Sequence, residues 1–221
     1  MIAGAVRVDR RRERTRAALL RAGQVLFATR SVDAVSIDDI VAAAEVAKGS
    51  FYNHFPDKDG LAREIAKQAR AAIELTVADI NTGVIDPAER VARALAMFAR
   101  GAEAFPIRAQ AMMRLFPFAS VPDAPMNRGV RADIQAGLAA GRFEGLAPEA
   151  AVMMAVGTAQ IAVSRVLERH AADAASTLAA TLAEDLIFGL LRGLGLDGAA
   201  ARAVAAKACA DIFAATLPSR L

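Results

Sequence analysis

The sequence lacks the residues that mark several classes of protein. Its single cysteine, Cys209, excludes an intramolecular disulfide, the bond typical of secreted proteins. Arginines crowd the start of the chain, where a signal peptide would need an apolar stretch. No apolar run reaches the roughly 18 to 20 residues that span a bilayer. We therefore expect a soluble, cytoplasmic protein that does not associate with a membrane.

Aromatic residues and strand-like patterns are scarce as well. The chain has no tryptophan, one tyrosine and ten phenylalanines, whereas alanine and leucine are abundant. Alanine and leucine are among the strongest helix formers, and the alternation of apolar and polar residues that marks a half-buried strand is almost absent. The sequence predicts an all-α protein, and its 221 residues are enough for a sizeable core.

Positive charge is concentrated in the first third of the chain. Residues 1–70 carry 13 Lys and Arg against 9 Asp and Glu, whereas residues 71–221 carry 14 against 15. Six arginines fall within residues 7–16. Such a segment attracts polyanions, duplex DNA above all, and Arg10, Arg11 and Arg12 are candidates for phosphate or minor-groove contacts. The alternative is a solvated basic tail without a partner.

The most informative stretch contains two short helices joined by a three-residue turn. We expect these helices over residues 37–44 and 48–55, with residues 45–47 between them. Ser36 is suited to cap the first helix, and Asp39 stands in the capping-box position three residues later. Pro56 should end the second helix. These are the dimensions of a helix-turn-helix.

The neighbouring helices complete a small bundle. The first helix is expected to begin after the arginine segment and to end near Thr29. A long helix should follow its N-cap Asp57 and run from Lys58 to Ile80. The expected core of this bundle is Leu19, Ala22, Leu26, Ile37, Ile40, Val46, Phe51 and Phe55. Further helices are expected over residues 87–105, 107–116, 126–140, 148–170, 173–194 and 198–217.

The second short helix has two distinct faces. Phe51 and Phe55 share the buried face, which anchors the helix. The other face and its edges carry the residues that a groove-reading helix needs, namely Lys48, Gly49, Ser50, Tyr52, Asn53 and His54. Ser36 and Lys58 lie at the N-termini of the flanking helices, where backbone N–H groups can hold phosphates. A plain helical turn with a polar surface is the alternative.

The run SIDDIVAAAEVAKGSFYNHFPDK, residues 36–58, resembles the signature of the TetR family of bacterial repressors. The likeness extends back to Arg14 and forward to about Leu61. It implies an all-α homodimer with an N-terminal three-helix DNA-binding domain, residues 1–57. A larger helical domain, residues 58–221, would bind an effector and dimerise. The DNA contacts that it implies are Ser36, Lys48, Gly49, Ser50, Tyr52, Asn53, His54 and Lys58.

Two positions depart from the commonest family pattern. Glu45 replaces a frequent glycine in the turn, and a non-glycine residue costs about 1 kcal/mol there if the backbone is left-handed. Ala47 stands where a serine or threonine is common, so a helix cap and a possible phosphate contact are missing. Both changes bear on the local geometry and the affinity for DNA, and neither bears on the fold.

The rest of the chain resembles the family in length and helical layout. Residues 152–166 and 178–194 are apolar on more than one face, as expected of helices buried on two sides, and in the family such helices pair about a twofold axis. Gly157, Gly189 and Gly193 would allow close approach, and packing within one chain is the alternative. Candidate effector contacts are the apolar Met97, Phe105, Met112, Phe116 and Met153, although such residues at helical spacing more often form core.

Other functions have less support in the sequence. An enzyme would need clustered reactive groups, and the chain offers only His54, His170 and Cys209 without a paired carboxylate motif or a plausible metal-ligand pair. We therefore expect no catalysis, no metal and no cofactor. A ligand carrier with a vestigial DNA-binding domain and a transcriptional activator both remain alternatives. The expected function is a repressor that binds a palindromic operator as a dimer and is released by a small, apolar effector.

Overall fold

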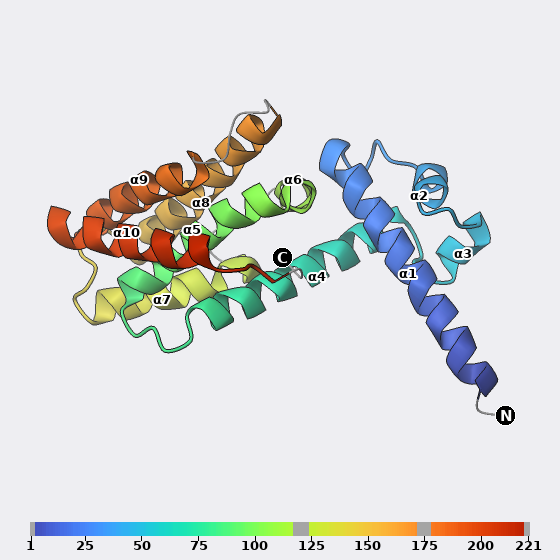
Figure 1. Cartoon of the computed structure of the whole chain (residues 1–221), viewed down its shortest axis with the longest axis horizontal. Coiled ribbons are helices and arrows are strands. Elements are labelled where there is room, and N and C mark those ends of the chain that lie inside the picture. The colour runs from blue at the N-terminus through green and yellow to red at the C-terminus, as the bar shows by residue number, and fades with distance from the viewer. Residues whose placement is uncertain (1–2, 117–123, 172–177, 219–221) are drawn as a thin grey trace. The chain divides into compact units, whose positions relative to one another are not determined.

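The chain is built from helices. The computed structural model describes residues 3–116, 124–171 and 178–218, and every element within them is helical (Figure 1). The elements are α1 (Ala3–Thr29), α2 (Ile37–Ala43), α3 (Lys48–Tyr52), α4 (Lys58–Ile80), α5 (Pro87–Ala104), α6 (Pro106–Leu115), the 3-10 helix η1 (Pro125–Asn127), α7 (Arg128–Ala139), α8 (Pro148–Ala171), α9 (Leu178–Gly193) and α10 (Gly198–Ala214). This confirms the all-α prediction.

Two helix boundaries near the N-terminus differ by three residues or more from those expected. In addition, α10 ends at Ala214 and not at residue 217, and the expected helix start at residue 173 lies outside the described residues. The arginine segment is not a separate arm, because α1 already begins at Ala3; arginine is itself a good helix former and no proline or glycine interrupts residues 5–22. The third helix ends at Tyr52 and not at Phe55. The backbone N–H groups of His54 and Phe55 both bond to the carbonyl of Phe51, a tight turn that directs Phe55 into the core.

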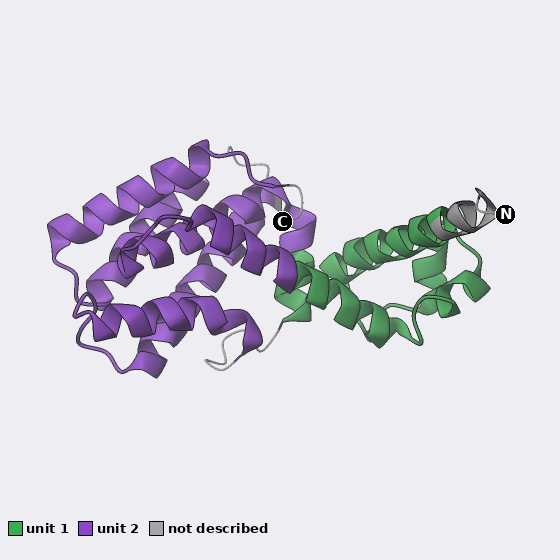
Figure 2. Cartoon of the chain, turned by 90° about the horizontal axis from the view of Figure 1, so that it is seen from below, with its two compact units in different colours: residues 1–69, 110–116 green, residues 70–109, 117–221 purple. Residues whose placement is uncertain are grey.

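The chain divides into two compact units (Figure 2). One comprises residues 1–69 and 110–116, and the other comprises residues 70–109 and 117–221. We call them the first and the second unit. Two of the three boundaries fall inside α4 and inside α6, so each of these helices contributes residues to both units. The predicted division into a DNA-binding domain, residues 1–57, and an effector-binding domain, residues 58–221, stays a prediction.

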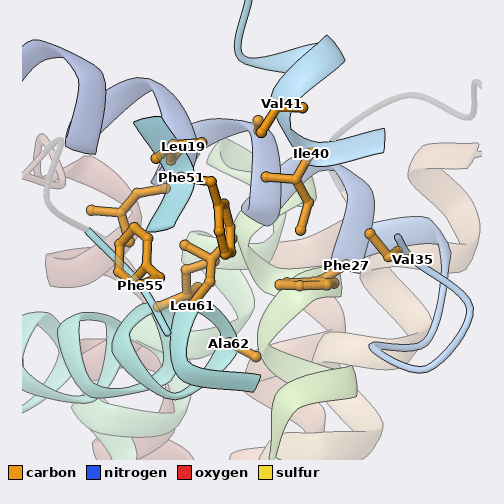
Figure 3. Close-up of a cluster of buried hydrophobic side chains, with 12 residues drawn as sticks. Leu19, Phe27, Val35, Ile40, Val41, Phe51, Phe55, Leu61 and Ala62 are labelled. Atoms are coloured by element: carbon orange, nitrogen blue, oxygen red, sulfur yellow. The ribbon is translucent and has the colours of Figure 1, made fainter. Parts of the chain in front are cut away.

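The core of the first unit joins α1, α2 and α3 to the start of α4 (Figure 3). Its buried members are Leu19, Leu20, Ala22, Phe27, Val35, Ile40, Val41, Phe51, Phe55, Leu61, Ala62 and Ile65. Five of the eight expected core residues are among them, while Leu26, Ile37 and Val46 pack partly buried against it. Phe27 was missed, although it is fully buried, because the sequence pattern placed Leu26 on the inner face of the helix.

The second unit is organised around α5. This helix packs against α7, α8, α9 and α10, and its buried residues are mostly alanines, which let the helix axes approach closely. Asp86 caps its first turn by accepting from the Ala88 N–H at 2.9 Å, as the Asp86-Pro87 sequence leads one to expect. Arg142 also donates to both Asp86 oxygens, at 3.0 and 2.8 Å. The start of α5 is thereby tied to the segment after α7.

The helix α8 of the second unit is long and unusually apolar. Residues 148–170 of α8 have the length and mean hydropathy (1.6) of a membrane span, although only 39% of that window is buried. Thr158 and Gln160 interrupt the apolar run, yet the mean hydropathy of the helix stays in the range of a membrane span. The helix packs against α5, α7 and α9. Its buried residues include Val152, Ala155 and Val156.

Candidate nucleic-acid interface

The start of α2 is fixed by a reciprocal cap. The backbone N–H of Asp39 donates to Ser36 Oγ and the backbone N–H of Ser36 donates to Asp39 Oδ2, both at 3.0 Å. The hydrogen bond from the Ser36 backbone lowers the pKa of the Asp39 carboxyl below its ordinary value, with a smaller effect from Arg30. This is the capping box that the sequence predicted. It sets the direction in which α2 enters the motif.

The turn between α2 and α3 depends on a left-handed residue. Glu45 has φ of 54° and is the one non-glycine residue with positive φ in the described part of the chain. The N–H of Val46 then reaches back to the carbonyl of Val41 at 3.0 Å, which closes the end of α2. The turn therefore has the geometry that glycine provides more easily, and the expected strain at position 45 is confirmed.

The helix α3 is anchored by one face and open on the other. Phe51 is fully buried and Phe55 nearly so, and both point into the core drawn in Figure 3. Gly49 and Asn53 are exposed, and Tyr52 keeps 54% of its surface accessible while its ring packs edge-on against Phe51. The N-cap Ala47 is extended and makes no side-chain hydrogen bond. The missing cap expected from the sequence is thus confirmed.

The polar edge of α3 is only partly exposed. Ser50 and His54 are half-buried. Desolvation lowers the pKa of His54, and the nearby charges of Arg12 and Arg16 lower it further. His54 is therefore neutral at pH 7, and it offers one donor and one acceptor rather than a positive charge. A direct ionic contact of His54 with phosphate is not favoured at that pH.

Lys58 has a structural role that the sequence did not reveal. Its Nζ donates to the carbonyl oxygens of Asp33 at 2.9 Å and Val35 at 3.1 Å, so it ties the start of α4 to the loop before α2. An ammonium has three donors, and the two used here fix its position beside Ser36 and the start of α2. The role of Lys58 in holding phosphate stays a prediction.

Several arginines of α1 lie on its solvent side. Arg10, Arg11 and Arg12 are exposed. Farther along the helix, Arg16 pairs with Glu64 at 2.6 Å and its guanidinium lies 5.6 Å from the centre of the Phe55 ring. Arg16 is therefore held against the bundle, whereas Arg10, Arg11 and Arg12 project into solvent.

The effector candidates are dispersed. Met97 is buried in α5, and Phe105 is half-buried at the C-terminal end of that helix. Met112 and Phe116 belong to the first unit and are half-buried, whereas Met153 on α8 is 49% exposed. Their common role in binding a ligand stays a prediction. In the described part of the chain no group of three or more His, Cys, Asp or Glu side chains is placed to hold a metal ion.

Cys209 does not have the environment of a nucleophile. It is buried in α10, and desolvation, with a smaller effect of Glu184, raises its pKa to about 12. A reactive cysteine needs an accessible thiolate near neutral pH. The thiol of Cys209 is therefore a small packing group.

Comparisons with known proteins agree with this geometry. Residues 19–65 match the bacterial regulatory proteins of the tetR family. Over 74 residues the chain is 31% identical to the HTH-type transcriptional repressor DhaR of Mycobacterium sp. (strain GP1), which is 33% of this chain and 37% of that protein. The matches thus span little more than a third of the length of the curated relatives.

Solved structures extend the likeness to the whole fold. RolR in complex with resorcinol shares 25% identity, with a TM-score of 0.57 over 90% of this chain and 96% of that one. A gamma-butyrolactone receptor (ArpA like protein) has a TM-score of 0.70 over 92% of this chain and 98% of that one, at 20% identity. Residues 19–65 thus carry the likeness to the tetR family of bacterial regulatory proteins, and the chain as a whole resembles these solved structures in its helical fold.

Proposed function

We propose that the protein is a ligand-responsive transcriptional repressor, which binds a palindromic operator as a homodimer and is released by a small, apolar effector. The observation that carries this proposal is the position of α3. Its apolar side is locked into the core by Phe51, and its other side presents Gly49, Tyr52 and Asn53 to solvent. Small residues and hydrogen-bonding tips on an anchored helix are what reading of a major groove requires.

The DNA contacts follow from this placement. Asn53 is suited to bond a base edge, and Tyr52 offers a hydroxyl to a phosphate and a ring to a sugar or a thymine methyl. Ser36, Lys48, Gly49, Ser50, His54 and Lys58 complete the proposed contact set. The exposed Arg10, Arg11 and Arg12 add sequence-independent attraction to phosphates.

The unpacked face of α8 supports the homodimer. Met153 and Ile161 are 49% and 63% exposed. Gly157 lies midway between them, and a Cβ added to it would have no neighbour within 4 Å. Gly189 of α9 is equally open, whereas a Cβ on Gly193 would meet Met154 of α8 at 2.6 Å. Gly193 thus serves packing within one chain, while the other two glycines leave room for a second chain. An apolar stripe of this kind needs a partner.

The proposed effector is a small apolar molecule. RolR is described in complex with resorcinol, and the ArpA-like protein is described as a gamma-butyrolactone receptor. The candidate contacts Met97, Phe105, Met112, Phe116 and Met153 are apolar or soft side chains that adapt to varied ligands. The bound effector favours a dimer whose recognition helices are wrongly spaced for successive major grooves.

Release by an effector has a direct test. A ligand shifts an equilibrium only by its preference for one of the two states. Titration of the operator complex with a binding ligand, followed by fluorescence anisotropy of labelled DNA, should show lower DNA affinity as the ligand saturates. Unchanged operator affinity with saturating bound ligand would contradict effector-driven release.

DNA binding itself is tested with the intergenic DNA upstream of the protein's own gene. We expect tight, sequence-selective and salt-sensitive binding by the wild-type protein at two salt concentrations, and loss of selectivity in Tyr52→Ala. The matched control Phe213→Leu changes an aromatic residue of α10, in the second unit and outside every proposed site, and should keep selective binding. If neither the upstream DNA nor duplexes selected from a random pool are bound selectively, the carrier alternative is favoured.

A further inference from the structure

An ion pair joins the two helices of the motif on their solvent side. Lys48 Nζ lies 2.8 Å from Asp38 Oδ1 and 3.1 Å from Asp38 Oδ2. Lys48 is the first residue of α3, and Asp38 belongs to the first turn of α2. The side chains are 55% and 70% exposed, respectively. The ammonium that should face DNA therefore already has an anionic partner.

The neighbouring carboxylate shows that this partnership is distinct from the helix cap. Asp39 completes the capping box with Ser36 and pairs with Arg30 at 3.2 Å. Asp38 takes no part in that box and instead bonds Lys48 with both oxygens. The hydrogen bond that Lys48 donates to Asp38 also raises the pKa of Lys48, so the lysine stays charged at any physiological pH. Because the Asp38 carboxylate has no role in the helix cap, it can compete with a DNA phosphate for the Lys48 ammonium.

Phosphate contacts and base contacts contribute differently to DNA recognition. Phosphate contacts by lysine and arginine supply essentially all of the affinity for DNA of unrelated sequence, whereas contacts to base edges distinguish one sequence from another. A carboxylate that pairs with a lysine of the reading helix lowers the affinity for DNA of unrelated sequence. It does not occupy the side chains that are proposed to contact bases, namely Tyr52 in the last position of α3 and Asn53 at the C-cap.

We propose that Asp38 is a specificity-determining residue, because its pair with Lys48 withholds that ammonium from phosphates and so lowers the affinity for DNA of unrelated sequence. The proposal rests on the proposed function. A phosphate that approaches α3 must displace the carboxylate and lie close to its negative charge. On an operator, the base contacts fix α3 so that Lys48 keeps Asp38 as one partner of its three hydrogen-bond donors, whereas on unrelated DNA Lys48 must leave Asp38 to bind a phosphate.

The test compares Asp38→Asn with wild type on an operator duplex and on a scrambled duplex of the same length and composition. Asn keeps the shape of the side chain and removes its charge. Affinity of Asp38→Asn for the scrambled duplex should rise about two- to fivefold, the range of an exposed ion pair. The slope of log affinity against log salt should steepen by about 0.9, the value for one additional phosphate contact. The ratio of operator to scrambled affinity should fall.

Two further variants separate the ion pair from the charge alone. Asp59→Asn removes one exposed carboxylate from the same unit without touching Lys48, and it should change scrambled-duplex affinity less than Asp38→Asn does. In a Lys48→Gln background the Asp38→Asn gain should disappear, because the lysine that it releases is gone. Persistence of the full gain in that background would overturn the proposal.

The other outcomes are equally decisive. Unchanged affinity of Asp38→Asn for the scrambled duplex contradicts the proposal. A loss confined to the operator also contradicts it and would instead assign Asp38 to a cytosine amino group. The scrambled-duplex arm needs no operator, so the two failures are distinguishable: absence of operator preference in the wild type contradicts the proposed function, and an unchanged scrambled-duplex affinity contradicts the role of Asp38.

Discussion

Gly23 of α1 lies directly against Ile65 of α4: a Cβ at Gly23 would be 2.8 Å from Ile65 Cδ1. It would also lie 2.9 Å from Leu61 Cδ2. Both neighbours are buried in the core of the first unit and have little room to move. The absence of a side chain at residue 23 therefore sets how closely α1 and α4 cross.

Substitution at this crossing should destabilise the protein. We expect Gly23→Ala to lower the free energy of unfolding by about 1 to 2 kcal/mol, because an additional methyl group overpacks the core. The matched control is Gly101→Ala in α5, where nothing lies within 4 Å of the new Cβ. That change should be neutral or stabilising by about 0.5 to 1 kcal/mol through helix propensity. Urea denaturation of both variants is the measurement, and equal stabilities would contradict the close crossing.

The strained turn predicts a substitution that stabilises. Glu45→Gly should raise the free energy of unfolding by about 1 kcal/mol, because glycine adopts positive φ without steric cost. For a chain of this size that corresponds to a rise in Tm of about 2 to 4 °C. Glu45→Ala keeps the strain while removing the charge, and it should give no comparable rise. If Glu45→Ala stabilises as much as Glu45→Gly, charge and not backbone strain is the cause.

The pair of Asp86 and Arg142 predicts a dependence of stability on pH. Hydrogen bonds from Arg142 lower the pKa of the Asp86 carboxyl below its ordinary value, which is about 3.9. A carboxyl with a lowered folded-state pKa stabilises the protein above its ordinary pKa, and this contribution is lost as the pH falls through the lowered value. Each side chain of the pair is about one-third exposed, so solvent screening limits the contribution to about 1 kcal/mol.

Arg142→Gln is the variant that tests this contribution. It should lower the free energy of unfolding at pH 7 and lose less stability than wild type between pH 5 and pH 2, as measured by urea unfolding at each pH. Arg70→Gln serves as the control, since its pair with Glu74 is longer, at 3.7 Å, and more exposed. A parallel decline of wild type and Arg142→Gln with falling pH would rule out the assigned pair.

The exposed stripe of α8 predicts the oligomeric state. Ile161→Glu should convert a homodimer into monomers, because the proposed pairing buries this 63% exposed side chain and a buried unpaired carboxylate is costly. Ile85→Glu, at an even more exposed isoleucine, should remain dimeric. Sedimentation equilibrium distinguishes the two. A monomeric wild type, or a dimeric Ile161→Glu, would contradict pairing through α8.

Much of the first unit was predictable from local sequence rules. Ser36 and Asp39 define a helix start through side chains only three residues apart, and the structure contains that capping box. The left-handed turn at Glu45 followed from the departure of one residue from a family pattern. These features depend on few neighbours, so they can be recognised without knowledge of the tertiary structure.

Features that depend on distant residues were not predictable. The bonds from Lys58 to the carbonyls of Asp33 and Val35 join residues more than twenty positions apart, and no local pattern indicates them. The pair of Lys48 and Asp38 was unpredictable for the same reason, because it joins side chains of two different helices. The helical state of the arginine segment was missed because a charged run was interpreted by its charge and not by its helix propensity.

We propose that two copies of the α2–α3 motif bind successive major grooves. Hydroxyl-radical footprinting of the wild-type protein on a selected duplex tests it, with Tyr52→Ala as the control. We predict two protected regions related by twofold symmetry, with centres about one helical turn or a whole multiple of it apart, and no protection by Tyr52→Ala at the same concentration. A single unsymmetrical region, or protection that Tyr52→Ala leaves unchanged, would contradict the account.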